Sequence, residues 1–497
     1  MTRAAGFDIV IVGGGAAGCV LARRLAEAGD RSVLLLEAGP DLRAATTPAM
    51  HDGWRLSTVP DWGLQSAPGV GGAPETLRRG RLLGGTSWLT RFAVRGAAAD
   101  FDGWAAAGNP GWGFDDVLPA FRRLEADLDF GGDPWHGDAG PLPITRYLDR
   151  PRSAIHEASL AAFDALGFPV VDDHNAPDSV GYGPMPMSSR AGVRVTAVDA
   201  YLPSAATPPA LTVRPDSPVD RVLLGAGRAT GVRLIDGTDI AADLVILAAG
   251  VYGSPAVLMR SGIGLAGHLR ELGIPVRVDL PGVGANLADH PGVDLDSGWR
   301  GPGAGDGEPI LHSIATFRSA GQALDAGPDL MFWVTDPFGA EPRLFLDPIL
   351  LKPLARGSVR LRSADPLEAP RITLPVVGEA ADVDRFVEAY RLGLELANHP
   401  EIRRLSPETA PPAPPGREAP SRIVMNNAYS IPHVVGTCAM GPRPGDGAVV
   451  DAGARVHGVD GLMVVDASII PKPPSGFPHV ITLMLAEHLA ERLVAQI

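Results

Sequence analysis

Residues 7–18 read FDIVIVGGGAAG, and this stretch decides how the rest of the chain must be built. Its first six residues are apolar except Asp8 and run into three glycines, which is typical of a buried parallel strand. From Ala16 to Ala28 the apolar residues recur at intervals of three and four, so a helix is predicted, and Gly29 ends it. A second strand is predicted over residues 32–36, which completes a βαβ unit.

The glycines of this unit each have a physical role. Gly13 permits the tight turn, Gly15 lets a pyrophosphate approach the backbone at the helix N-terminus, and Gly18 lets helix and strand pack closely. Glu37, roughly 20 residues further on, can accept a hydrogen bond from a ribose hydroxyl. A glycine-rich turn without a ligand is the alternative, but the surrounding strand, helix, strand and acid favour a dinucleotide site.

The overall composition limits the class of protein and of partner. A chain of 497 residues, 45% of them hydrophobic, can bury large cores in two or more domains. Its formal net charge of -14 argues against nucleic acid and against anionic membrane surfaces as partners. Arginine carries nearly all of the positive charge, a bias that indicates a GC-rich coding sequence and says little about mechanism.

Cys19 and Cys438 are the only cysteines, too few for a disulfide scaffold or a cysteine-rich metal site, and no metal is expected. Cys19 directly follows the last glycine of the first turn and is interpreted as a small core residue. The N-terminus lacks a charged and apolar leader, and Phe7 to Val12 is too short to span a membrane. These features predict a soluble, cytoplasmic protein.

A second glycine-rich turn, at residues 80–87, can present backbone N–H groups and hydroxyls to an anion. Taken alone, such a turn is more commonly a solvated loop. After it, Trp88 to Thr90 is interpreted as the first turn of a helix. The turn ends in Gly84, Gly85, Thr86 and Ser87.

The order of the predicted elements favours a domain that is interrupted and later resumed. A meander of strands leads to a second buried strand, and a helix opens at Ser254-Pro255. Isolated strands with one helix over residues 382–397 then form a mostly antiparallel layer, which the proline-rich residues 410–420 end. A strand at 462–467 and a helix at 480–495 then resume the pattern of the first domain. The predicted strands before the antiparallel layer span residues 211–213, 219–224, 231–234, 239–240 and 244–250.

Six spaced motifs resemble the glucose-methanol-choline (GMC) family of FAD-dependent oxidoreductases over essentially the whole chain. The resemblance implies FAD as the cofactor and, most often, oxidation of a small-molecule alcohol to an aldehyde or ketone. The motifs are FDIVIVGGGAAG with its acid Glu37, GRLLGGTS at 80–87, GSPAVLMRSGIG at 253–264, PGVGANLADH at 281–290, PHVVGTCAMG at 432–441 and GLMVVDASIIP at 461–471.

The expected fold is an α/β FAD-binding, Rossmann-like domain with an inserted α+β substrate-binding domain whose sheet is mostly antiparallel. The FAD-binding domain is predicted to comprise residues 1–150, 195–292 and 430–497. The substrate-binding domain is predicted to comprise residues 151–194 and 293–429.

The resemblance also implies positions at the cofactor and the active site. Val219 matches the position whose backbone meets the adenine, and Asp466 and Ala467 match the pair near the pyrophosphate and the ribityl chain. His433 matches the active-site histidine of the family. His479 falls where members carry a second histidine or an asparagine.

Two segments depart from the family pattern. Many members have an asparagine where Thr90 stands, and the asparagine-containing run before the second active-site residue is replaced by Ser475 to Pro478. Relatives with covalent flavin use a histidine close to the second glycine-rich turn. Because no histidine lies between Gly80 and Gly96, we expect noncovalent FAD.

Alcohol oxidation requires a group that accepts the hydroxyl proton while hydride leaves the carbon for the flavin N5, and histidine titrates near neutral pH. We expect His433 to accept the proton and His479 to hold the oxygen, although the two roles could be exchanged. Without the resemblance, a hydrogen-bonded structural role for His433 would be at least as good an interpretation. His290 and His488 are interpreted as structural.

Other functions stay open at this point. Trp333, Phe332 and Tyr429 are candidates for a substrate pocket, but aromatic residues in such segments are more often core. Some relatives are FAD-containing lyases or decarboxylases, others are natural-product tailoring oxidoreductases, and a nonenzymatic flavin-binding protein is a further alternative. A bacterial monomer or homodimer is expected, with oxygen or another electron acceptor reoxidising the flavin.

Overall fold

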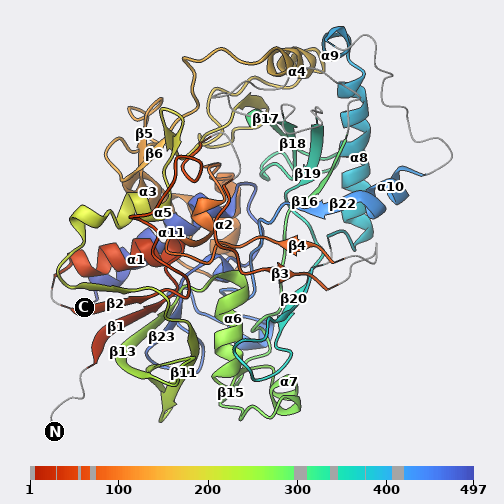
Figure 1. Cartoon of the computed structure of the whole chain (residues 1–497). Helices are drawn as coiled ribbons and strands as arrows, with labels where there is room; N and C mark the ends of the chain where they lie inside the picture. The colour runs from red at the N-terminus through yellow and green to blue at the C-terminus, as the bar shows by residue number, and fades with distance from the viewer. Residues whose placement is uncertain are drawn as a thin grey trace.

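The structure is a computed structural model, which describes residues 6–29, 31–53, 57–67, 74–295, 311–335, 345–374, 376–405 and 419–496. These residues form two large sheets, one built around parallel strands and the other antiparallel. Figure 1 shows them at opposite ends of the molecule, with β1, β2 and β13 low and β16 to β19 in the upper half. Of the described helices, none is long and apolar enough to cross a membrane.

The predicted βαβ unit forms the centre of a seven-stranded sheet. β1 pairs in parallel with β2 and β13, β2 with β10, and β13 with β23. β13 also carries β12 and β11 as an antiparallel meander. The strands are β1 (Phe7–Val12), β2 (Val33–Leu36), β10 (Leu211–Arg214), β11 (Val219–Gly225), β12 (Arg228–Leu234), β13 (Asp239–Leu247) and β23 (Leu462–Val464).

This sheet differs from the prediction in two respects. The strands expected at residues 239–240 and 244–250 are the single strand β13. Its first half alternates between exposed and buried residues and its last three residues are all buried, so the pattern changes within one strand. The strand predicted at residues 211–213 pairs with β2 instead of joining the meander.

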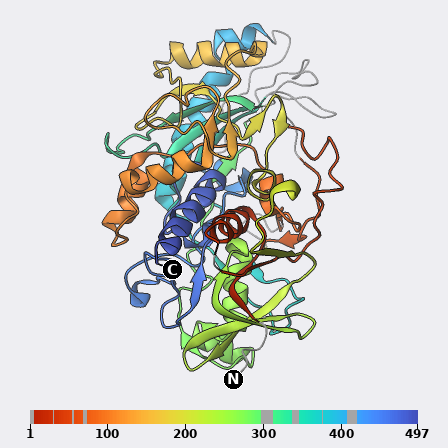
Figure 2. The same ribbon diagram turned by 90° about the vertical axis from the view of Figure 1, so that its left-hand side faces the viewer.

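Helix α1 (Ala16–Glu27) lies side by side with α11 (Pro478–Val494), as Figure 2 shows. The Glu487 carboxylate on α11 is buried and accepts hydrogen bonds from Arg24 of α1 and from the Tyr201 hydroxyl, both at 2.8 Å. Because a buried carboxylate needs a compensating charge, this contact favours one arrangement of the two helices.

Helix α6 (Gly250–Arg260) begins four residues before the predicted start at Ser254. Pro255 therefore lies inside the helix and cannot donate to the carbonyl of Val251. The Thr437 hydroxyl donates to that carbonyl instead, at 2.6 Å. A residue remote in sequence thus makes the early start possible.

The second sheet has six antiparallel strands in the order β22-β16-β19-β18-β17-β7, and α8 (Ala380–Ala397) packs on it. Along β18, Phe332 belongs to the core on the α8 side, whereas Met331 and Trp333 belong to a separate cluster on the opposite face. The strands are β7 (Tyr182–Pro184), β16 (Pro291–Val293), β17 (Leu311–Phe317), β18 (Leu330–Thr335), β19 (Phe345–Leu350) and β22 (Ala428–Ser430).

The remaining described elements are short. The strand pairs are β3 (Leu64–Gln65) with β4 (Thr76–Leu77), β5 (Glu125–Asp127) with β6 (Leu142–Ile144), β8 (Ser189–Arg190) with β9 (Val193–Arg194), β14 (Ile263–Gly264) with β15 (Val278–Asp279), and β20 (Ser358–Arg360) with β21 (Arg371–Thr373). The helices are η1 (Gly85–Trp88), α2 (Ala98–Ala106), α3 (Phe114–Leu124), α4 (Ala154–Ala165), α5 (Ala197–Tyr201), η2 (Ser204–Ala206), α7 (Ala266–Glu271), α9 (Pro400–Arg404), α10 (Pro420–Asn427), η3 (Pro444–Asp446) and η4 (Ala467–Ile469).

The helix predicted to begin at Trp88 is instead the 3₁₀ turn η1, which ends at that residue. Gly84 and Gly85 have φ of 95° and 52°, so the backbone at the start of this turn is left-handed, a conformation that favours glycine. Residues 410–418 of the predicted proline-rich segment lie outside the described residues. The domain boundaries stay a prediction.

Candidate active site

The turn between β1 and α1 forms an open cradle. A Cβ on Gly13, whose φ is +106°, would lie 2.5 Å from the Ala248 carbonyl oxygen, and one on Gly18 would lie 1.9 Å from the Gly13 oxygen. A Cβ on Gly15, the residue before α1, would meet nothing within 4 Å. Two glycines are therefore required by close packing, and the third borders free space at a helix N-terminus, where an anion is favoured.

The second glycine-rich turn lies directly on the first. The Gly84 N–H donates to the Gly14 carbonyl at 2.7 Å, and a Cβ on Gly85 would lie 2.8 Å from the Gly15 Cα. The Ser87 hydroxyl donates to the Gly84 carbonyl at 2.6 Å, which holds the turn closed. Thr86 is half-buried beside it.

Glu37 lies at the end of β2, with both carboxylate oxygens bound to backbone amides. It accepts from the Gly14 and Gly39 N–H groups, each at 2.8 Å. Burial raises the pKa of Glu37 to about 7, although these hydrogen bonds oppose the shift. The Ser217 N–H donates to the Glu37 carbonyl at 2.8 Å, which brings the segment before Val219 to the same end of the sheet.

Asp466 joins the ends of two parallel strands. Its carboxylate accepts from the Gly250 N–H at 2.9 Å and the Ser254 hydroxyl at 2.6 Å, both on α6, and from the Ser468 N–H at 2.8 Å. Burial raises the pKa of Asp466. The carbonyl of Ala467 accepts from the Gly436 N–H at 3.3 Å. These bonds tie η4 to α6 and to the segment that carries His433.

The side chain of His433 is half-buried and contacts a second histidine. The Nδ1 atoms of His433 and His290 lie 3.2 Å apart. The backbone N–H of His433 donates to the Asp289 carboxylate at 2.6 Å, and Ser430 also bonds this carboxylate. Burial, followed by the influence of His290 and Arg79, lowers the pKa of His433 well below its usual value. Its imidazole is therefore neutral near neutral pH and can accept a proton.

Two aromatic rings lie beside His433, and a third packs against both of them. The Phe477 ring lies 4.7 Å from the imidazole, centroid to centroid, and the Trp333 ring lies 6.1 Å from it. Phe92 lies 5.9 Å from Trp333 and 6.1 Å from Phe477. The indole N–H of Trp333 is enclosed and has no acceptor among the described residues. Trp333 therefore stays a candidate for the substrate pocket, whereas Phe332 is core.

His479 lies in the first turn of α11, two residues after Phe477. Its Nε2 is enclosed and has no hydrogen-bond partner within the described part of the chain. Burial, with the nearby charge of Arg194, lowers the pKa of His479 to about 4. The unpartnered nitrogen is available to a group that the protein alone does not supply.

His290 is the site residue whose importance the sequence analysis missed. It was interpreted as structural, yet its ring contacts the imidazole of His433. The available signal was the Asp289-His290 pair that ends the PGVGANLADH motif. Nothing local in that motif indicates that residue 290 meets residue 433.

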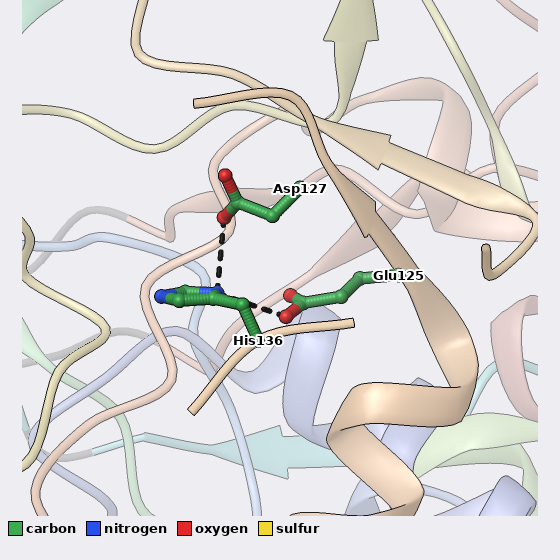
Figure 3. A group of neighbouring side chains, drawn as sticks. All are labelled: Glu125, Asp127 and His136. Carbon is green, nitrogen blue, oxygen red and sulfur yellow. Dashed lines mark hydrogen bonds and ion pairs between the residues drawn. The ribbon is translucent and has the colours of Figure 1, made fainter. Parts of the chain in front are cut away.

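A second cluster, shown in Figure 3, has the residue types of a metal site. His136 Nδ1 lies 2.9 Å from Glu125 and 3.1 Å from Asp127. Arg95 pairs with Glu125, Arg146 bonds both Asp127 and Asp173, and His136 Nε2 lies 2.8 Å from Asp173. Three cationic groups thus face the three most buried carboxylates, and Asp129 adds a fourth carboxylate 3.7 Å from Arg146. Because every one of these carboxylates has a cationic partner, we assign the cluster a structural role.

Comparison with known proteins identifies the family. Sequence profiles described as GMC oxidoreductase match residues 7–292 and 353–486. The chain belongs to the GMC oxidoreductase family. It is 35% identical to 5-(hydroxymethyl)furfural oxidase of Methylovorus sp. (strain MP688), over 99% of each chain.

Solved structures agree with this assignment. The crystal structure of pyridoxine 4-oxidase from Mesorbium loti has a TM-score of 0.89 and 32% identity, covering 98% of each chain. An FAD-dependent oxidoreductase from Chaetomium thermophilum has a TM-score of 0.88 and 26% identity, covering 99% of each chain. This GMC protein is an oxidoreductase with FAD as its cofactor, and the space at Gly15 beside the second glycine turn fits such a group.

Proposed function

We propose that this protein oxidises the CH–OH group of an alcohol to an aldehyde or ketone, with His433 as the base. The observation that supports this most directly is the half-buried, neutral imidazole of His433, which lies beside the rings of Phe477 and Trp333. FAD, when bound, supplies the acceptor for the hydride that leaves the carbinol carbon.

His433 has a defined task in this reaction. It accepts the hydroxyl proton on an imidazole nitrogen, which strengthens the developing carbonyl as the C–H bond breaks. His479, whose Nε2 has no partner among the described residues, holds the same oxygen by a hydrogen bond. Phe477 lies on one side of His433 and limits the access of water.

We propose that the substrate is an aromatic or heteroaromatic carbinol. Phe92, Trp333 and Phe477 offer ring faces and edges to a planar substrate. The free indole N–H of Trp333 can donate to a ring oxygen or nitrogen. The related proteins named for 5-(hydroxymethyl)furfural and pyridoxine act on alcohols of this kind.

The cofactor contacts complete the proposal. Gly13, Gly15 and Gly18 admit the pyrophosphate, while Glu37 receives a ribose hydroxyl on lone pairs that its two amide bonds leave free. The second turn (Gly84, Gly85, Thr86 and Ser87) and the Asp466-Ala467 pair border the remainder of FAD, and the backbone of Val219 meets the adenine. We further propose noncovalent FAD, a cytoplasmic location and oxygen as the electron acceptor.

Anaerobic flavin reduction tests this function. The holoenzyme is mixed without oxygen with benzyl alcohol, with 5-(hydroxymethyl)furfural or with cyclohexylmethanol, which has the bulk of benzyl alcohol but no π-system. We expect the first two to bleach the flavin roughly ten-fold faster than the third, and oxygen to restore the colour. Bleaching by none of them would contradict the proposal.

A further inference from the structure

We propose that His290 is a positioning residue that fixes the proton of His433 on Nδ1 and leaves Nε2 as the basic nitrogen. This inference rests on the proposed role of His433 as base. It concerns which of the two imidazole nitrogens can receive the substrate proton.

The argument begins at the carbonyl of Pro474. His290 Nε2 lies 3.0 Å from this oxygen, and a carbonyl oxygen can only accept a hydrogen bond. His290 Nε2 must therefore carry a hydrogen. In a neutral imidazole the other nitrogen then has a lone pair, so His290 Nδ1 is an acceptor.

The contact between the two histidines determines which nitrogen of His433 carries the hydrogen. Their Nδ1 atoms are 3.2 Å apart, and a hydrogen bond over this distance needs one hydrogen. Because His290 Nδ1 is the acceptor, His433 Nδ1 must be the donor. The remaining nitrogen of a neutral His433, Nε2, is then unprotonated.

The segment that carries the Pro474 carbonyl is held on both sides. Lys352 Nζ donates to the carbonyl of Pro473 at 3.0 Å and also pairs with Asp100. The backbone N–H of Ser475 donates to the same Asp100 carboxylate at 2.6 Å. The acceptor for His290 is thus fixed by contacts independent of either histidine.

The charged surroundings keep both rings neutral. Lys352 faces His290, and burial with this charge lowers the pKa of His290 to about 3. Arg79 acts on His433, and Asp289 bonds the backbone N–H of both histidines. Among the described residues, no carboxylate contacts either imidazole, so neither is protonated in advance of the reaction, and the tautomers follow from the hydrogen bonds.

A matched pair of variants separates the positioning role from a structural one. In His290→Asn, the amide oxygen comes close to the former Nδ1 and can still accept from His433, but the bond to Pro474 is lost. In His290→Gln, the amide N–H₂ can reach Pro474, but the acceptor for His433 is lost. We expect His290→Gln to slow anaerobic flavin reduction by roughly 10²-fold and His290→Asn by less than about ten-fold. Equal rates in the two variants, or the reverse order, would overturn the proposal.

Nitrogen-15 NMR of histidine-labelled holoenzyme without substrate reads the tautomers directly, with His433→Gln and His290→Gln used to assign the signals. We expect hydrogen on Nδ1 of His433 and on Nε2 of His290, and hydrogen on Nε2 of His433 would overturn the inference. This measurement does not depend on turnover. Normal flavin reduction in His433→Ala would refute the proposed base while leaving the tautomer result unchanged, so the two failures are distinguishable.

Discussion

His136 and His433 are the same residue type in opposite environments. His136 is enclosed by Asp127, Asp173 and Glu125, whose hydrogen bonds overcome the effect of burial and raise its pKa to about 10. His433 has a neutral histidine and aromatic rings around it, and its pKa is lowered. His136 is therefore charged near neutral pH, which suits a structural role, whereas the neutral His433 keeps a lone pair, which suits its proposed role as base. Carboxylate neighbours, more than burial, decide which role a histidine takes.

The sharpest way to test this comparison is to remove the base. His433→Ala should slow anaerobic flavin reduction by roughly 10²–10⁴-fold while FAD stays bound, because the proton acceptor is lost and the glycine turns are untouched. Rapid mixing measures the rate, and the visible spectrum measures bound flavin. His479→Asn is the matched control, with a smaller expected loss because it keeps a hydrogen-bonding group. A larger defect in the control would exchange the two roles.

Removing the charged histidine should instead affect stability. His136→Ala leaves three buried carboxylates facing two guanidinium groups, so the free energy of unfolding should fall by about 3–5 kcal/mol. His457→Ala, which loses only a bond to the Gly441 carbonyl, should cost about 1 kcal/mol. Denaturant unfolding gives both values, and activity per folded molecule should change little in either variant.

The stability difference between the wild-type protein and His136→Ala should depend on pH. Because the folded-state pKa of His136 is raised from 6.5 to about 10, its stabilising contribution is complete below 6.5 and is lost as the pH rises through about 10. The wild-type protein should therefore lose stability over this range relative to His136→Ala. Parallel curves of unfolding free energy against pH for the two proteins would show that His136 is not charged.

Replacing Glu37 should have the smallest effect of these changes, a loss of FAD affinity. Glu37 is a buried carboxylate bound by amides, so the comparison predicts a binding role without a large catalytic one. Glu37→Ala should weaken FAD binding by about 1–3 kcal/mol and change turnover per bound flavin less. Glu27→Ala, in an exposed ion pair on α1, is the control. An unchanged dissociation constant for FAD would show that Glu37 does not contact the cofactor.

The sequence predicted elements whose signal is local. β1 matches its predicted bounds, and α1 ends one residue early, because periodicity and a terminal glycine define them. The start of α6 at Gly250 could not be predicted in this way, since Asp466 caps its first turn and Thr437 compensates Pro255. Both partners are far away in the chain.

The residues of the candidate site also divide into those that a local motif indicated and those that only distant contacts revealed. His433 was proposed because its motif resembles a known one. The aromatic candidates at residues 332 and 333 could not be separated until the pleat of β18 assigned them to opposite faces. His290 was missed because its meaning lies in contacts with His433 and Pro474, which come from two other segments. Tautomers depend on such contacts and leave no pattern in the sequence.

The contact between Arg24 and Glu487, 463 residues apart, has a consequence for how the protein is made. During synthesis, the βαβ unit leaves the ribosome long before α11 can cover α1 and before Asp466 can cap α6. The nascent chain therefore has a dinucleotide turn before the segments that pack around it exist, and the apolar face of α1 stays uncovered until α11 has been made. We therefore expect FAD capture to follow the synthesis of α11.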